Sequence, residues 1–89
     1  MKVKIHPNTF EKIENMLKES GKEAIRIKAT SSCWAGLNTE VVLDEQREND
    51  EISIDRGIKI VADKSISHFF TDATIEYKNT ILGKKFKIY

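Results

Sequence analysis

The chain has 89 residues, which suits one compact domain spanning residues 1–89 and leaves no room for a second. Its 15 Lys and Arg residues nearly balance its 14 Asp and Glu residues, so the formal net charge is only +1, and the two signs alternate along the sequence. This balance argues against a nucleic-acid partner, because a surface that releases counterions from phosphates needs concentrated positive charge.

The apolar segments are too short for a membrane protein. The longest extend over a few residues, whereas a helix that spans a bilayer needs about 20, and Met1 to Lys4 lead into no apolar signal core. The one cysteine, Cys33, cannot form an intramolecular disulfide, which is typical of proteins in the reducing cytosol. We therefore expect a cytoplasmic protein without a membrane association.

The first two predicted elements are a short strand and an amphipathic helix. Residues 2–5 alternate Lys with Val and Ile, which indicates a strand with one buried face. Pro7 suits a helix entry, Asn8 and Glu11 have the spacing of an N-cap and its acidic partner, and Gly21 suits a left-handed stop. The intervening apolar residues recur every three or four positions, so this helix of about three turns has a stripe that faces the core: Phe10, Ile13, Met16 and Leu17.

After the helix the period of the apolar residues changes to two, which predicts strands. Residues 25–29 alternate Ile or Ala with Arg or Lys and form the first of these strands, and residues 30–36 follow as a loop of mostly small and polar residues. Residues 40–43 predict another strand. The charged run at 44–50 carries too much charge for a core element, so we expect a solvated turn there.

The next segment has the pattern of a hairpin followed by a short helix. Residues 52–54 alternate Ile with a polar residue, Gly57 marks a tight turn, and residues 58–62 continue as a more fully buried strand. Asp63 is a plausible N-cap for a short helix through residues 65–70.

Two strands close the predicted set, at residues 74–77 and 86–89. The total is about seven short strands, one long N-terminal helix and one short second helix. We therefore predict a small α+β domain that is mainly β.

The chemistry available to the chain centres on one thiol. The sequence has no phosphate-binding Gly-rich motif, no His and Glu pair at metalloprotease spacing and no nucleophile elbow, so we expect no enzyme activity. Cys33 lies in the predicted loop, and its thiolate would be a soft ligand suited to iron, copper(I) or zinc. Hydroxyl and N–H groups of Ser31, Ser32 and Ala35 could lower its pKa. The alternative is that Cys33 is merely a small residue that fits the fold.

Three other side chains have the right chemistry for a site but a simpler explanation. His6 precedes the helix and His68 lies in the short second helix, where a histidine usually caps, packs or faces solvent rather than binding a metal. Trp34, beside the thiol, either anchors a protein partner or covers the end of the core.

Three segments resemble the HesB/IscA-like (A-type) iron-sulfur cluster biogenesis family. Residues 25–36 (IRIKATSSCWAG) resemble the family's strand and first-cysteine loop, residues 57–65 (GIKIVADKS) look like its glycine, apolar strand and Asp, and residues 86–88 (FKI) look like its late aromatic strand. The likeness covers nearly the whole chain in order. It implies a HesB-like domain, mostly β, with a compact helix at the start.

The resemblance also implies a ligand set, of which this sequence matches one member. Proteins of the family bind iron or iron-sulfur clusters through three cysteines and pass them to acceptor proteins, often as dimers or tetramers. Cys33 matches the first cysteine, but the family's C-terminal Cys-Gly-Cys motif has no match up to Tyr89, and both Trp34 and Ala35 precede Gly36 where one small residue is common. The chain is thus expected to be a divergent member whose single matched ligand, for metal or cluster, is Cys33.

Three functions follow from these observations. The leading hypothesis is an accessory of iron-sulfur cluster assembly that binds iron or a labile cluster through Cys33, with assembly or acceptor proteins as partners. A homodimer would supply two thiolates, and a small thiol or a partner's cysteine would supply the rest. The alternatives are a protein-binding module without metal, which uses Trp34 and the Cys33 loop as a contact patch, and a single-thiol redox protein with a reactive Cys33 of low pKa.

Overall fold

Seven strands, one α-helix and one short 3₁₀ helix make up the computed structural model, which describes residues 1–32, 36–80 and 83–89. In chain order the elements are β1 (Val3–Ile5), α1 (Pro7–Ser20), β2 (Ala24–Ser32), β3 (Gly36–Asp44), β4 (Asp50–Asp55), β5 (Ile58–Asp63), η1 (Ser67–Phe69), β6 (Ala73–Thr80) and β7 (Gly83–Ile88). The predicted class, mainly β with an N-terminal helix and a short second helix, is confirmed.

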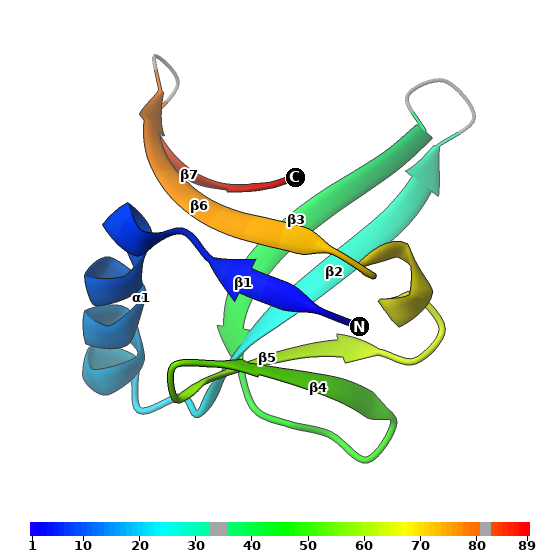
Figure 1. Cartoon of the computed structure of the whole chain (residues 1–89), viewed down its shortest axis with the longest axis horizontal. Helices are drawn as coiled ribbons and strands as arrows, with labels where there is room; N and C mark the ends of the chain where they lie inside the picture. The colour runs from blue at the N-terminus through cyan, green and yellow to red at the C-terminus, as the bar shows by residue number, and fades with distance from the viewer. Residues whose placement is uncertain (33–35, 81–82) are drawn as a thin grey trace.

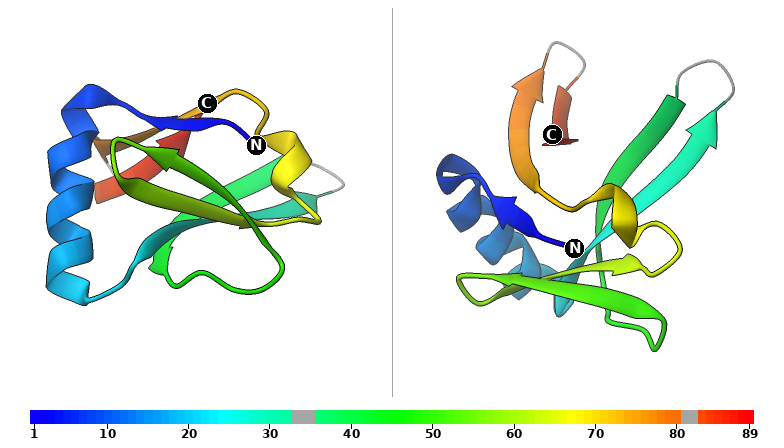
Figure 2. Two further views of the ribbon diagram at one scale, coloured as in Figure 1. Left: turned by 60° about the horizontal axis from the view of Figure 1, so that its bottom comes forward. Right: turned by 45° about the vertical axis from the view of Figure 1, so that its right-hand side comes forward.

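The strands form two sheets (Figure 1). The four-stranded sheet has the order β3-β2-β5-β4, and the three-stranded sheet has the order β1-β6-β7. The pairs β2–β5 and β1–β6 are parallel, and the other pairs are antiparallel. Helix α1 lies at one side of both sheets, as the left view of Figure 2 shows.

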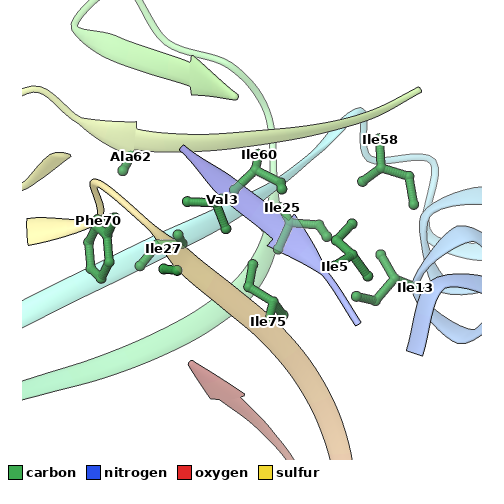
Figure 3. Close-up of a cluster of buried hydrophobic side chains, with 11 residues drawn as sticks. Val3, Ile5, Ile13, Ile25, Ile27, Ile58, Ile60, Ala62, Phe70 and Ile75 are labelled. Atoms are coloured by element: carbon green, nitrogen blue, oxygen red, sulfur yellow. The ribbon is translucent and has the colours of Figure 1, made fainter. Parts of the chain in front are cut away.

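The core fills the space between the sheets and is rich in isoleucine (Figure 3). β-Branched side chains pack well on pleated strands, and each one that is fully buried contributes about 1.5–3 kcal/mol. The fully buried isoleucines come from both sheets and from the helix: Ile5, Ile13, Ile25, Ile27, Ile60 and Ile75.

The start of helix α1 differs from the prediction. The N-cap is His6 rather than Asn8, because the His6 Nδ1 atom accepts a hydrogen bond from the Asn8 N–H at 3.2 Å and Pro7 is the first helical residue. Glu11 is exposed and makes no capping contact with a described residue. The predicted stop is confirmed, since Gly21 has φ 72° and its N–H donates to a helix carbonyl. The helix has 14 residues, or about four turns.

The predicted core stripe of helix α1 is also confirmed. Ile13 is fully buried, and Phe10, Met16 and Leu17 are partly buried against the core. Thr9 is buried as well, because its Oγ1 accepts a hydrogen bond of 2.9 Å from a backbone N–H of β6. The helix is therefore fixed to the three-stranded sheet by a polar contact as well as by its apolar face.

Strands β2 and β3 extend well into the predicted loop at 30–36. Their antiparallel pairing continues to the pair Ser32 and Gly36, so residues 30–32 and 36 belong to strands and the loop prediction is wrong for them. Residues 33–35 lie outside the described residues. The prediction failed because Thr30, Ser31 and Ser32 contain no residue type that ends a strand, and the backbone of the partner strand satisfies their backbone hydrogen bonds.

Strand β4 turns its polar residues inward, toward strand β1. The Val3 N–H donates to the Ser53 Oγ at 3.2 Å, and that hydroxyl in turn donates to the Val3 carbonyl. The Ile5 N–H donates to the Asp55 Oδ2 at 2.8 Å, and the Arg56 Nη2 donates to the Ile5 carbonyl at 2.7 Å. These contacts satisfy backbone groups of β1 that face away from β6, and they join the two sheets.

The isoleucines of β4 lie on the opposite, outer face as a result. Ile52 is 38% exposed and Ile54 is 66% exposed. The predicted alternation and the tight turn at Gly57 are both present, and φ at Gly57 is 89°. The alternation therefore located the strand, although its polar face is the one that packs.

The charged run at 44–50 is only partly the solvated turn that we predict. Residues 45–49 connect β3 to β4, whereas Asp44 and Asp50, at its two ends, bind Arg26 of β2. Asp50 is 8% exposed and Arg26 is 5% exposed. A charge can be buried in this way only where a well-placed partner compensates the loss of water.

The geometry of this cluster is close and bidentate. The Arg26 Nη1 and Nη2 atoms donate to the two Asp50 oxygens at 2.7 and 2.6 Å, and Nε donates to Asp44 Oδ2 at 2.6 Å. The hydrogen bond from Arg26 holds the pKa of Asp50 below its usual range. The pKa of Asp44 is lowered by the backbone N–H of Glu45 and then by Arg26.

The predicted short helix at 65–70 is a single 3₁₀ turn, η1, at Ser67–Phe69. Asp63 ends strand β5 and is not the N-cap, which is Ile66. The Asp63 carboxylate instead accepts a hydrogen bond from the Ser65 N–H at 2.9 Å and so shapes the turn after β5. The last two predicted strands are present as β6 and β7, and residues 81–82 between them lie outside the described residues.

Candidate functional site

Cys33, the predicted ligand, lies in the connection between β2 and β3 and outside the described residues, as do Trp34 and Ala35. The structure shows how strands β2 and β3 lead to this connection. Strand β2 pairs with β5 only over Ala24 to Arg26, and beyond that point its strand partner among the described residues is β3. The outer half of the hairpin thus extends past the four-stranded part of the sheet (Figures 1 and 2).

The Arg26 cluster fixes the base of this hairpin. Arg26 faces Val42 across the β2–β3 ladder, and its guanidinium also binds the Glu45 carbonyl at 3.0 Å. The same side chain holds Asp50 of β4, so it connects both strands of the hairpin to the far edge of the sheet. The hairpin that carries Cys33 therefore begins from a rigid base.

A second hairpin, β6–β7, diverges from the first in all the views of Figures 1 and 2. Its aromatic pair, Tyr77 and Phe86, packs edge to face with ring centroids 4.8 Å apart. Phe86 and Ile88 are partly buried against the core. The inner half of this hairpin completes the core, whereas its outer end extends away from the β2–β3 hairpin.

The two histidines have the simple roles that we expect. His6 caps helix α1, and its Nδ1 atom lies 3.8 Å from the Glu76 Oε2. His68 is exposed in η1, with its ring centroid 4.1 Å from that of Phe69. Within residues 1–32, 36–80 and 83–89, no three His, Cys, Asp or Glu side chains are grouped so that they could hold a metal ion.

Two polar clusters that the structure contains were not predicted from the sequence. One is the Arg26 cluster, for which the available signal was a single Arg between two isoleucines and an acidic residue at each end of the charged run. The other is the junction of β1 with β4, where Asp55 and Arg56 contact the backbone of Ile5. The Arg26 cluster positions the strands that lead to Cys33, whereas the other cluster joins β1 to β4 and does not involve β2 or β3.

Comparison with solved structures finds proteins similar to this chain, whereas comparison by sequence with family models and curated proteins does not. No family model matches the sequence, and no curated protein matches it. Among solved structures, Escherichia coli SufA, involved in the biosynthesis of iron-sulfur clusters, superposes with a TM-score of 0.81 at 16% identity, over 99% of this chain and 79% of SufA. IscA with the [2Fe-2S] cluster superposes with a TM-score of 0.77 at 17% identity, over 98% of this chain and 83% of IscA.

This chain has the fold of IscA and SufA. A protein from Aquifex aeolicus, solved in solution, has the same likeness, with a TM-score of 0.67 and 22% identity over 96% of this chain and 87% of its own. The HesB-like domain predicted from the resemblance is confirmed as a fold. Identities of 16–22% support the architecture and do not carry ligands from one protein to another.

No helix among the described residues is long and apolar enough to cross a membrane. The longest, α1, has 14 residues, of which seven are Lys, Glu or Asn. Its polar face is exposed and its apolar face is in the core.

Proposed function

We propose that this protein is an accessory of iron-sulfur cluster assembly, which binds iron or a labile iron-sulfur cluster through Cys33 and passes it to an acceptor protein. The observation that supports the proposal is the superposition of nearly the whole chain on SufA and on IscA, whose structure holds a [2Fe-2S] cluster. In this role the iron or the cluster is cargo, and the protein is a cytoplasmic carrier rather than an enzyme.

The chemistry of Cys33 is consistent with this role. Cys33 is the one thiol of the 89 residues, and a thiolate is a ligand of choice for iron in clusters. The strands on either side of it are paired up to Ser32 and Gly36, so both ends of the connection start from an ordered ladder. The β2–β3 hairpin extends past the four-stranded part of the sheet (Figure 1), so we expect a second protein to reach its outer end.

Ligand number then predicts a shared and labile site. A cluster takes four protein ligands or their equivalent, and two copies of this chain contribute two thiolates through Cys33. A small thiol or a cysteine of the acceptor protein supplies the others. Sharing of this kind favours transfer, because replacing the external ligands by the acceptor's cysteines moves the cluster without unfolding the carrier.

The test is anaerobic reconstitution of the purified protein with iron and sulfide in the presence of glutathione. The product is desalted, its iron and sulfide are measured, and its absorption spectrum is recorded. Cys33→Ser removes the proposed ligand, and Trp34→Ala, a change of the neighbouring residue that keeps the thiol, is the matched control. We expect thiolate-to-iron absorption bands and retained iron in the wild type and in Trp34→Ala, and neither in Cys33→Ser.

The oligomeric state provides a second reading of the same samples. If two copies share one cluster, light scattering after size exclusion should show a dimer that forms with iron and sulfide and dissociates on chelation. Iron that is retained equally by Cys33→Ser would refute the assignment of the ligand. A wild type that stays colourless and free of iron would refute the proposed function and favour a protein-binding module without metal on the same fold.

A further inference from the structure

An open hollow of about 420 Å³ lies where the start of helix α1 meets the β4–β5 turn and the edge of the three-stranded sheet. Its size is within the range of sites for small molecules, about 300–1,000 Å³. The residues that line it come from four separate parts of the chain, and most of them carry polar groups: Lys4, His6, Asp55, Arg56, Thr74 and Tyr89. This hollow is distinct from the β2–β3 connection that carries Cys33.

Arg56 occupies an unusual backbone position beside the hollow. It forms a two-residue hairpin turn with Gly57, and φ is positive at both positions, 49° and 89°. Turns of this kind favour Asn or Gly at the first position, because a larger side chain is strained there. The guanidinium is nevertheless well held, since its Nη2 donates to the Ile5 carbonyl and to Asp55 and its carbon lies 4.2 Å from the ring centroid of Phe10.

The guanidinium has donors left over for a ligand. Its hydrogen bonds to described residues use Nη2, whereas Nη1 and Nε have no acceptor among those residues. The planar Arg fork fits the two oxygens of a carboxylate or phosphate, and it loses little freedom on binding when packing already holds it. Arg56 therefore offers a preorganised pair of N–H groups.

The other polar groups of the hollow add positive charge and donors. Lys4, which faces Thr74 across the β1–β6 pair, forms no ion pair with a described residue. His6 uses Nδ1 as an acceptor, so its Nε2 carries the proton in the neutral form and is a donor. Asp55 is the one carboxylate side chain of the lining, and its Oδ2 already accepts a backbone N–H and faces Arg56. Among the side chains of the described lining, two cationic groups thus face one engaged carboxylate.

We propose that this hollow binds a small oxyanion, the phosphate or carboxylate group of a small molecule. Arg56 is its bidentate donor and Lys4 is its second positive charge. The proposal is independent of iron binding at Cys33, because the described residues that line the hollow come from other elements than the β2–β3 hairpin.

The test is a titration of ¹⁵N-labelled protein, followed by NMR, with inorganic phosphate and separately with succinate, at constant ionic strength maintained with sodium chloride. Arg56→Asn removes the guanidinium and places at this turn a residue that positive φ favours, so the fold is retained. Lys4→Gln removes the second charge. Lys22→Gln, which removes an exposed charge after helix α1, is the matched control.

We expect saturable shifts of the backbone amides at residues 4–6 and 55–57 with at least one of the two anions. Arg56→Asn should weaken binding about tenfold or more and Lys4→Gln roughly two- to fivefold, whereas Lys22→Gln should bind like the wild type. Saturation by phosphate alone or by succinate alone identifies the group that the hollow prefers. Shifts that stay linear and spread over the lysines with both anions would overturn the proposal, as would equal affinities of Arg56→Asn, Lys4→Gln and Lys22→Gln.

Discussion

Replacing Asp50 by Asn tests the buried Arg26 cluster with almost no change in shape. Both carboxylate oxygens of Asp50 accept hydrogen bonds from Arg26, at 2.6 and 2.7 Å, and both side chains are almost fully buried. An amide keeps one acceptor, turns the other into a donor that faces the guanidinium, and leaves the positive charge partly uncompensated. Breaking a buried ion pair by changing one partner typically costs about 3–5 kcal/mol.

The expected loss is smaller here, because Arg26 retains Asp44 at 2.6 Å and the Glu45 carbonyl at 3.0 Å. We therefore expect the free energy of unfolding to fall by about 2–3 kcal/mol. A domain of this length has a total of about 4–13 kcal/mol, at roughly 0.05–0.15 kcal/mol per residue. At about 4–8 °C for each kcal/mol, the midpoint of thermal unfolding should fall by roughly 10–20 °C.

The assay is urea and thermal unfolding followed by circular dichroism, with Glu48→Gln as the control. Glu48 lies in the same turn, is exposed and forms no ion pair with a described residue, so its change to an amide should have an effect below about 0.5 kcal/mol. If Asp50→Asn is as stable as Glu48→Gln, the ion pair does not hold the turn to the sheet. Our account of the buried charge would then be wrong.

Three further predictions concern pH, the helix cap and the two faces of the sheet. Folding lowers the pKa values of Asp50 and Asp44, so their contribution to the free energy of unfolding should be complete above the unfolded pKa of about 3.9 and be lost as pH falls further. In urea unfolding between about pH 6 and pH 2.5, Asp50→Asn should therefore lose less stability than the wild type. His6→Ala should cost about 0.5–2 kcal/mol by removing the acceptor for the helix N-terminus, and His6→Asn should recover most of this loss in thermal unfolding. In urea unfolding, Ile60→Ala should lower the free energy of unfolding by about 2–5 kcal/mol, because Ile60 is buried, whereas Ile54→Thr on the outer face should change it by less than about 0.5 kcal/mol. Equal losses in the two variants would contradict the assignment of inner and outer faces.

The kinds of secondary structure and their order could be read from the sequence because they depend on local patterns. The stripe of helix α1 repeats every three or four residues, and the strands alternate every two, which are the repeats of the backbones themselves. Gly21 was correctly predicted to end the helix and Gly57 to form a tight turn, since a positive φ favours glycine wherever the residue lies in the fold. These features need no knowledge of distant residues.

The candidate site was found from the sequence by composition and by resemblance. Cys33 is the one thiol in the chain, and its flanking segment resembles the cysteine loop of a known family. What the sequence did not indicate is how that connection is supported: strands β2 and β3 continue to Ser32 and Gly36, and Arg26 fixes the base of their hairpin. The hollow beside Arg56 was also missed, because its lining residues are far apart in the chain.

The sequence by itself determined where strands and helix occur, and the tertiary structure decided which of their faces pack. Alternation in β4 defines two faces but not the inner one, and the polar face turned inward because the free edge of β1 needs hydrogen-bond partners that Ser53 and Asp55 provide. Arg26 could be buried only because Asp50, which lies 24 residues later, meets it. Helix α1 was capped by His6 rather than Asn8 because the chain leaves β1 directly into the helix at Pro7, two residues earlier than the Asn8 signal indicates. In each case the outcome depends on satisfying a polar group through a partner set by the fold, and local patterns carry no information about that partner.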